Sequence, residues 1–179
     1  MTIYLIRHGK TEANERRLYC GSTDLPLSAA GREELKGLHY EISNVRFLTS
    51  GMVRANETME LLFPGVPYEQ EPRFREVDFG AFEMCSYEQL KDVPEYQDWL
   101  SGDNESNVPP GGESGREMTQ RVLAAMKDIR EDTCIVTHGG VIAAILSSLF
   151  PKENRNRYQW QPKNGCGYVI FEDGFEAVP

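Results

Sequence analysis

Two short apolar runs, each followed closely by a histidine, constrain the fold more than any other feature of the sequence. Ile3–Ile6 leads into Arg7-His8-Gly9, and Cys134–Val136 leads into Thr137-His138-Gly139-Gly140. Such runs are typical of strands buried in a parallel sheet. Parallel sheets bind ligands beyond the carboxyl ends of their strands. We therefore expect His8 and His138, two of the three histidines of the chain, to face one small site.

The remaining sequence alternates between strand-like and helix-like patterns, which is typical of an α/β fold. Met118, Val122, Met126 and Ile129 follow at steps of four, four and three residues, which predicts one apolar helix face. We predict further strands at 45–49 and near 68–71, a closing hairpin over 168–178, and helices from Ser28 to about Glu41, over Val53–Leu62, from Glu113 or Ser114 onward, and over about Val141–Leu149.

The length of 179 residues predicts a single domain that spans residues 1–179. Residues 82–110 carry aromatic, acidic and proline residues without one clear period. We interpret this segment as an insertion on the substrate side of the domain, with short helices near 86–91 and 94–100.

Charge and cysteine usage argue against several functions. The net charge of −9 argues against nucleic-acid binding, which needs a basic face. No run reaches the ~18 apolar residues of a membrane span, and Met1 leads directly into a strand pattern. The four cysteines, Cys20, Cys85, Cys134 and Cys166, are too widely spaced to suggest a zinc site or a disulfide framework. We therefore expect a cytoplasmic protein without a metal or other cofactor.

The sequence lacks the usual signatures of nucleotide-driven transfer, serine hydrolysis and dinucleotide redox chemistry. What remains is a pair of histidines with arginines nearby. His8 stands between Arg7 and Gly9, and a neutral imidazole held in one tautomer is a competent nucleophile toward phosphorus. The alternative is a hydrogen-bonded histidine at the end of a strand.

Arg7 and Arg54 are candidate anion clamps, because forked guanidinium groups match the oxygens of a transferring phosphoryl group. For a single arginine the alternative, a surface ion pair, is the commoner role. Both, however, lie close to the ends of predicted strands, which favours a shared site.

His138 precedes a glycine pair and an apolar helix, whose N-terminus offers free N–H groups to an anion. We expect an imidazolium here to add positive charge to the site. Phosphoester cleavage also needs an acid for the leaving group. Glu76, Asp78 and Glu83 are all candidates, and the residue pattern by itself does not choose among them.

In combination these segments resemble the histidine phosphatase superfamily, also called the phosphoglycerate mutase-like family. The resemblance covers nearly the whole chain. It rests on four motifs and the second histidine, in order: Arg7-His8-Gly9-Lys10-Thr11-Glu12, Ser50-x-x-x-Arg54-Ala55-x-x-Thr58, Glu76-x-x-Phe79-Gly80, Gly111-Gly112-Glu113-Ser114, and Thr137-His138-Gly139-Gly140.

The resemblance implies a three-layer α/β/α sandwich around a mostly parallel six-stranded sheet. It also implies a phosphohistidine intermediate on His8 that forms without a metal. The phosphoryl group would be bound by Arg7, Arg54, His138, Asn14 and the Gly139 backbone. Among the three acids, the resemblance selects Glu76 as the proton donor.

Within this family, the stretch Tyr19-Cys20-Gly21-Ser22-Thr23-Asp24-Leu25-Pro26-Leu27 looks like the α-ribazole phosphatase branch. It implies substrate contacts at Cys20, Gly21, Ser22 and Thr23, although Cys20 could also serve only the structure of the loop. Lys10 and Phe82-Glu83-Met84 depart from the usual family pattern, and we expect these positions to influence substrate preference.

We therefore expect a phosphatase for a small phosphorylated metabolite, with α-ribazole 5′-phosphate as the first candidate substrate. One alternative is a cofactor-dependent phosphoglycerate mutase, although a chain of 179 residues leaves little room for the lid of such enzymes. The other is a non-catalytic phosphate-binding protein. We expect neither nucleic-acid nor membrane partners, and a homodimer is possible.

Overall fold

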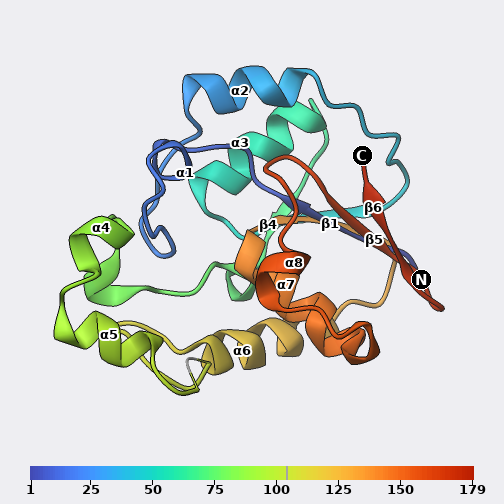
Figure 1. Cartoon of the computed structure of the whole chain (residues 1–179). Coiled ribbons are helices and arrows are strands. Elements are labelled where there is room, and N and C mark those ends of the chain that lie inside the picture. Colours follow the sequence, from blue (N-terminus) through green and yellow to red (C-terminus); the bar gives the residue numbers. More distant parts are fainter. Residues whose placement is uncertain (104) are drawn as a thin grey trace.

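One six-stranded sheet organises the computed structural model, which describes residues 1–103 and 105–179 (Figure 1). The strand order is β3-β2-β4-β1-β5-β6. The pairs among β1, β2, β3 and β4 are parallel, whereas β5 pairs antiparallel with both β1 and β6. The predicted mostly parallel sheet and closing hairpin are therefore confirmed. The strands are β1 Ile3–Arg7, β2 Arg46–Thr49, β3 Glu69–Gln70, β4 Thr133–Thr137, β5 Gly167–Ile170 and β6 Phe175–Val178.

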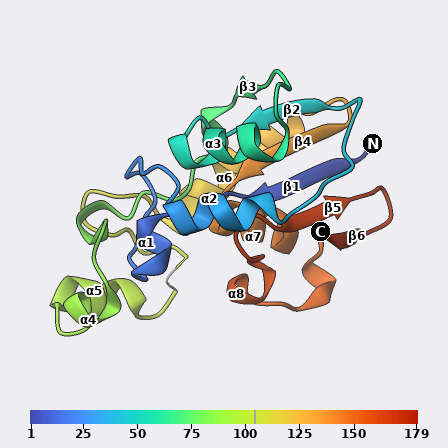
Figure 2. The ribbon, with the colours of Figure 1, turned by 90° about the horizontal axis from the view of Figure 1, so that it is seen from above.

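Helices cover both faces of the sheet, as the two views at right angles show (Figures 1 and 2). α2 and α3 lie on one face, and α6, α7 and α8 lie on the other. Three further helices lie outside these two layers, beyond the carboxyl ends of the parallel strands (Figure 2). The helices are α1 Glu12–Glu15, α2 Ala29–Lys36, α3 Val53–Leu62, α4 Tyr87–Leu90, α5 Pro94–Leu100, α6 Gly115–Lys127, α7 Gly139–Leu149 and α8 Arg157–Trp160.

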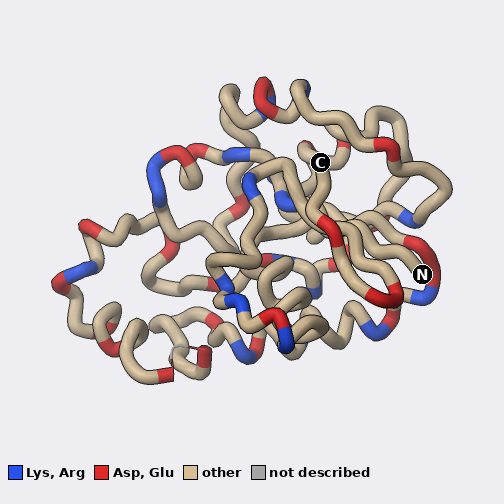
Figure 3. The backbone as a smooth tube through the Cα atoms, turned by 45° about the vertical axis from the view of Figure 1, so that its right-hand side comes forward, with Lys and Arg blue, Asp and Glu red and all other residues tan. Residues whose placement is uncertain are grey.

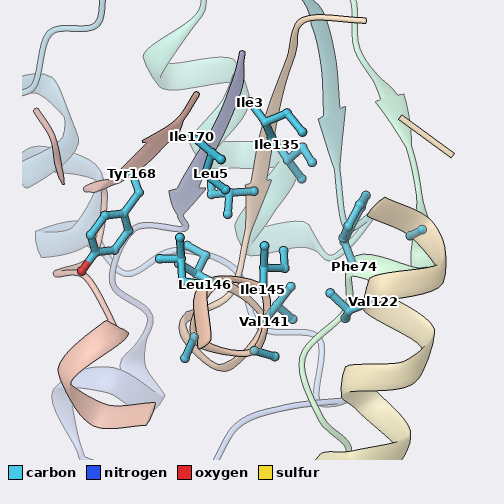
Figure 4. Close-up of a cluster of buried hydrophobic side chains, with 14 of the residues drawn as sticks. Ile3, Leu5, Phe74, Val122, Ile135, Val141, Ile145, Leu146, Tyr168 and Ile170 are labelled. Carbon is cyan, nitrogen blue, oxygen red and sulfur yellow. The ribbon is translucent and has the colours of Figure 1, made fainter. Parts of the chain in front are cut away.

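Alternation along the central strands feeds two separate cores. In β4, Ile135 packs toward α6 and α7, while Cys134 and Val136 pack toward α3. Successive side chains of a strand point to opposite faces, so a strand covered on both faces is apolar throughout. Figure 4 shows the first core, where Leu5, Ile135 and Ile170 from the sheet meet Val141, Ile145 and Leu146 of α7. Cys134 is the buried apolar residue that its position predicted.

A third cluster lies in the cap, the name used here for residues 82–103 and 105–110 with α4 and α5. Phe82, Leu90 and Tyr96 are buried together, and Tyr19, Phe79 and Trp99 pack against them. The cap extends away from the sheet (green in Figure 1). Residue 104, which belongs to the predicted insertion 82–110, lies outside the described residues.

Several element boundaries differ from the prediction. The helix after Ser28 ends at Lys36, with Gly37 as its C-cap, rather than near Glu41. α7 begins at Gly139, two residues before the predicted start, because His138 is its N-cap. α1 and α8 were not predicted. Each has four residues and is held by a capping box at its start, and so short a helix shows no readable period.

Positively and negatively charged residues are interspersed along the chain (Figure 3). At the β3 edge, Arg73 pairs with Glu71 at 2.7 Å and with Asp128 at 2.8 Å. Exposed pairs of this kind contribute little stability individually. Here these ion pairs connect the start of the segment that runs from β3 toward Glu76 to the end of α6.

None of the helices in the described part of the chain is long and apolar enough to cross a membrane.

Candidate active site

Three neighbouring strands end side by side, and each is followed by a polar residue. β4 lies between β2 and β1, with Thr49 opposite Val136 and Arg7 opposite Thr137. Ser50, His138 and His8 follow these three strands and therefore form a row at the carboxyl edge of the sheet. The ladder continues into the row, because the His8 N–H donates to the Thr137 carbonyl at 2.9 Å.

His8 is buried and oriented by its own backbone neighbourhood. Its Nδ1 lies 2.7 Å from the Gly9 carbonyl oxygen, which can only accept, so the ring proton is on Nδ1. Burial lowers the pKa of His8 well below its ordinary value, and the positive charges of Arg54 and Arg7 lower it further. The ring is therefore neutral, and its Nε2 lone pair is free.

Arg54 is an almost fully buried guanidinium, with 1% of its surface exposed. Its Nη1 donates to the Thr23 carbonyl and its Nη2 to the Gly21 carbonyl, both at 2.8 Å. Thr58 connects Arg54 to the backbone beside His8, because its hydroxyl donates to the Arg54 carbonyl at 2.6 Å and accepts from the Gly9 N–H at 2.9 Å. One arginine is thus held from two directions.

Arg7 and His138 supply the two unsatisfied atoms of the site. Arg7 Nη1 donates to the Pro162 carbonyl at 2.8 Å, and His138 Nε2 lies 2.8 Å from Ser50 Oγ. Across the described ranges, Arg7 Nε and His138 Nδ1 are the two buried side-chain nitrogen or oxygen atoms without a hydrogen-bond partner. Buried polar atoms are rarely left unpaired. Both nitrogens are therefore candidate contacts for a bound ligand.

The expected imidazolium at His138 is wrong for the unliganded protein. Burial, together with the charges of Arg54, His8 and Arg7, lowers the pKa of His138 well below its ordinary value. The two histidine rings are 5.1 Å apart between centroids. Both rings are buried beside two guanidinium groups, and this disfavours a proton on either of them, so His138 is neutral.

Glu76 lies against the N-terminus of α7. Its Oε2 accepts from the Gly140 N–H at 2.9 Å, and its Oε1 accepts from the Val77 N–H at 3.0 Å. A Cβ atom at Gly140 would lie 2.4 Å from Glu76 Oε1, so only glycine permits this approach. Burial lowers the pKa of the Arg7 guanidinium, and the nearby Glu76 opposes this by raising it.

Arg121 of α6 braces the segment that carries Glu76. It donates to the carbonyl oxygens of Arg73, Arg75 and Glu76 at 2.7–3.0 Å. Two further hydrogen bonds, at 2.7 and 2.9 Å, join it to Glu113. A planar guanidinium suits such a fan of acceptors. Glu76 is consequently positioned without a regular strand or helix beneath it.

The two rival acids serve the loop at 21–23 instead. Glu83 accepts from the N–H groups of Gly21 and Ser22 and from the Thr23 hydroxyl, at 2.8–3.1 Å. Asp78 accepts from the Ser22 hydroxyl at 2.8 Å. Hydrogen-bond donors of Gly21, Ser22 and Thr23, which were predicted to contact the substrate, are thus already bonded to Glu83 and Asp78. Their assignment as substrate contacts stays a prediction.

The loop also requires Gly21 for steric reasons. A Cβ atom there would lie 1.7 Å from the Val77 carbonyl oxygen. Cys20 closes the loop through a 3.5 Å hydrogen bond from its thiol to the Thr23 carbonyl, and burial raises the pKa of this thiol. This hydrogen bond gives Cys20 a structural role in the loop. The four cysteines, all within the described residues, are free thiols.

Asn14 lies on α1, directly after the His8 turn. Its side-chain oxygen accepts from the Thr11 N–H at 3.0 Å and so caps the helix. The amide NH₂ is the part of this side chain that remains to donate. A phosphate contact by Asn14 stays a prediction, as does one by the Gly139 backbone. Gly139 lies close to the Arg7 guanidinium, because a Cβ atom at Gly139 would be 3.1 Å from Arg7 Cζ.

The structure brings His8, His138, Arg7, Arg54 and Glu76 to one place. It adds residues that sequence reasoning did not assign to the site. Ser50 and Thr58 belong to the Ser50-x-x-x-Arg54-Ala55-x-x-Thr58 motif, which was a usable signal. Gly140 had its glycine pair as a signal. Arg121 had none, because the acceptors through which it holds the Glu76 segment are backbone carbonyls 45 to 48 residues away.

Comparison with known proteins agrees with this geometry. The sequence pattern of the histidine phosphatase superfamily (branch 1) matches residues 3–176. The chain belongs to this superfamily, and it is accordingly a phosphatase-type hydrolase.

Individual relatives carry two kinds of names. The adenosylcobalamin/α-ribazole phosphatase of Salmonella typhimurium is 32% identical and covers 99% of this chain and 94% of its own length. A probable phosphoglycerate mutase, GpmB, of Yersinia enterocolitica is 29% identical with the same coverage of 99% and 94%. The solved structure of a phosphoglycerate mutase from Thermus thermophilus superimposes with a TM-score of 0.81 at 29% identity, covering 100% of this chain and 99% of that one.

These coverages correct one sequence argument. The short chain was expected to favour hydrolysis over mutase chemistry. The Yersinia protein and the Thermus structure, both named as mutases, match over 94% and 99% of their own lengths, so chain length alone does not favour hydrolysis.

Proposed function

We propose that this chain hydrolyses a small phosphomonoester through a phosphohistidine on His8, without a metal, and that α-ribazole 5′-phosphate is its first candidate substrate. The observation that carries the proposal is the pair of unpartnered buried atoms, Arg7 Nε and His138 Nδ1, beside a neutral His8. A phosphoryl group between them would accept from Arg7 and bring phosphorus within reach of His8 Nε2.

In the first step the His8 Nε2 lone pair attacks phosphorus as the ester P–O bond breaks. The leaving oxygen takes a proton from the Glu76 carboxylic acid. In the second step Glu76, now a carboxylate, takes a proton from water, whose oxygen attacks phosphorus. The P–N bond breaks, its electron pair returns to Nε2, and inorganic phosphate leaves. Arg7 and Arg54 bind the phosphoryl oxygens in both steps.

The name of the Salmonella relative supports α-ribazole 5′-phosphate, and with it a role in cobalamin biosynthesis. The charge around Glu76 supports a leaving group without a second negative charge. Glu76 borders a cavity of about 520 Å³ that is also lined by Asp78, Glu113 and Glu117. Of its two lining arginines, Arg121 is paired with Glu113. A phosphoglycerate whose carboxylate entered this cavity would meet repulsion from these acids.

The test is a steady-state screen of the full chain with α-ribazole 5′-phosphate, p-nitrophenyl phosphate and 3-phosphoglycerate, each with and without EDTA. We expect hydrolysis that survives EDTA, is inhibited by vanadate, and is fastest for α-ribazole 5′-phosphate. NMR of the 3-phosphoglycerate reaction detects any 2-phosphoglycerate. Isomerisation faster than hydrolysis would instead establish a mutase, and activity lost in EDTA would exclude this mechanism.

His8→Ala tests the nucleophile itself. We expect kcat/KM to fall by roughly 10⁴-fold or more, as when other covalent nucleophiles are removed. His39→Ala, at the exposed third histidine, is the matched control and should retain wild-type activity. Denaturation in alkaline SDS should trap a phosphorylated wild-type protein whose phosphate is stable in base and lost in acid, and His8→Ala should trap none.

A further inference from the structure

Ser50 makes a buried contact with His138 that has no part in the reaction proposed above. Ser50 and His138 each have 0% of their surface exposed. The Ser50 hydroxyl oxygen lies 2.8 Å from His138 Nε2. The neighbouring strand ends of β2 and β4 enforce this contact, since the Ser50 N–H also donates to the Val136 carbonyl at 3.2 Å.

The direction of this hydrogen bond follows from counting donors. The Met52 N–H points at Ser50 Oγ at 3.3 Å and uses an acceptor position of the hydroxyl. The hydroxyl retains one proton to donate, and His138 Nε2 is the acceptor beside it. If Nε2 carried a proton instead, the Ser50 hydroxyl would need another acceptor, and none contacts it among the residues described.

The other ring nitrogen is the unpartnered one. With Nε2 accepting, the single proton of a neutral His138 ring lies on Nδ1. Nδ1 is buried without a hydrogen-bond partner within the described chain. An N–H group at this position would be a ready donor to an anionic oxygen.

We propose that Ser50 is a positioning residue that holds His138 in the Nδ1–H tautomer, so that a neutral imidazole donates one hydrogen bond to a phosphoryl oxygen. The proposal rests on the proposed function, because it assigns that oxygen as the ligand. Both histidines then carry their proton on Nδ1, with opposite results. His8 turns its lone pair toward phosphorus, and His138 turns its proton toward oxygen.

Loss of Ser50 should remove this bias. A His138 ring with its proton on Nε2 would direct a lone pair at the phosphoryl oxygens and repel them. A hydrogen bond to a charged group is worth roughly 10- to 100-fold in binding. We therefore expect Ser50→Ala to weaken vanadate inhibition and lower kcat/KM by about 10-fold or more. Ser50→Cys, with a weak donor of similar size, should fall between Ser50→Ala and wild type.

Nitrogen-15 NMR of the imidazole rings measures the tautomer without any activity. The chain has three histidines, and exposed His39 provides a reference signal. At neutral pH we expect Nδ1 protonated and Nε2 unprotonated in both His8 and His138. In Ser50→Ala the His138 signals should move toward the other tautomer while those of His8 stay unchanged. A wild-type His138 protonated on Nε2, or on both nitrogens, would overturn the proposal.

A double-mutant cycle separates a positioning role from a structural one. His138→Asn keeps an N–H donor near the Nδ1 position without a tautomer to set. In that background Ser50→Ala should lower vanadate affinity by less than about twofold, because there is no longer a His138 tautomer for Ser50 to hold. An equal loss in both backgrounds would mean that Ser50 acts only through packing. If NMR shows the Nδ1–H tautomer but neither vanadate nor phosphate binds, the proposed function fails and Ser50 lacks the ligand assigned to it.

Discussion

The strand-end half of the site, formed by Ser50, His138 and His8, is held differently from the loop half, formed by residues 21–23 and 76–83. In the strand-end half the backbone is part of the sheet ladder, since His8 and Ser50 both donate to β4 carbonyls. In the loop half the backbone is held by side chains, chiefly Glu83 and Arg121.

This difference determines how far a single substitution can act. Breaking one ladder bond leaves neighbouring bonds and two buried cores in place. Removing Glu83 leaves the Gly21 and Ser22 N–H groups without their acceptor and loosens the two carbonyls that hold Arg54. The loop half is therefore the easier half to displace.

The largest expected effect in the loop half is at Glu76. Glu76→Gln keeps the shape of the side chain but removes proton transfer, so kcat/KM for an alkyl phosphate should fall roughly 10²- to 10⁴-fold. p-Nitrophenyl phosphate needs little protonation of its leaving group. We expect it to give a burst of one nitrophenol per chain and then slow turnover, because water lacks its base.

Stopped-flow absorbance measures this burst. Asp78→Asn changes the neighbouring carboxylate, which bonds to the Ser22 hydroxyl, and serves as the matched control. It should show no burst. A burst in Asp78→Asn and no burst in Glu76→Gln would show that Asp78, rather than Glu76, is the proton donor.

A smaller effect is expected from Glu83. Glu83→Ala should lower kcat/KM and vanadate affinity by similar factors, about 10- to 100-fold, because in the proposed reaction Arg54 binds phosphoryl oxygens in both steps. Steady-state kinetics and vanadate inhibition measure both. Glu88→Ala, at an exposed carboxylate of α4, is the control. Unchanged vanadate affinity in Glu83→Ala, in a variant with wild-type urea unfolding, would show that the loop does not position Arg54.

The smallest effect concerns the strand-end half and pH. The folded-state pKa of His8 is lowered, whereas in the unfolded chain it is about 6.5. As pH falls below that value the unfolded chain gains a proton that folded His8 refuses, so stability decreases. The contribution of each such histidine has a limiting slope of about 1.4 kcal/mol per pH unit.

Urea unfolding at about pH 7.5 and about pH 5.5 measures this loss. His8→Gln should lose less stability than wild type across this window, and His39→Gln should lose as much as wild type. An identical loss in wild type and His8→Gln would mean that His8 is not held neutral in the folded protein.

The sequence predicted the strand-end half well, for a physical reason. A buried parallel strand has a clear apolar signature, and a residue directly after it must lie at the carboxyl edge. Arg7, His8 and His138 are placed by that rule alone. The helix over Val53–Leu62 has the predicted bounds, and it brings Arg54 to the same edge.

The loop half was only partly predictable. Glu76, Asp78 and Glu83 look alike in sequence, and choosing among them needed the family resemblance. Their different roles depend on tertiary hydrogen bonds that no local pattern encodes, such as those from Gly21 and Ser22 to Glu83. The neutral state of His138 was missed because it depends on the neighbouring cations as well as on burial.

The aromatic cluster of the cap has a consequence for changing the enzyme. It packs mainly against itself, and outside the cap it meets the body of the protein at Tyr19 and Phe79. Tyr19 immediately precedes Cys20, and Phe79 follows Asp78, so both connect directly to the loop half. Residues of α4 and α5 can therefore be exchanged as a unit while the sheet edge with His8 and His138 stays untouched. Because we interpret the cap as the substrate side of the domain, we expect such exchanges to change the preferred leaving group.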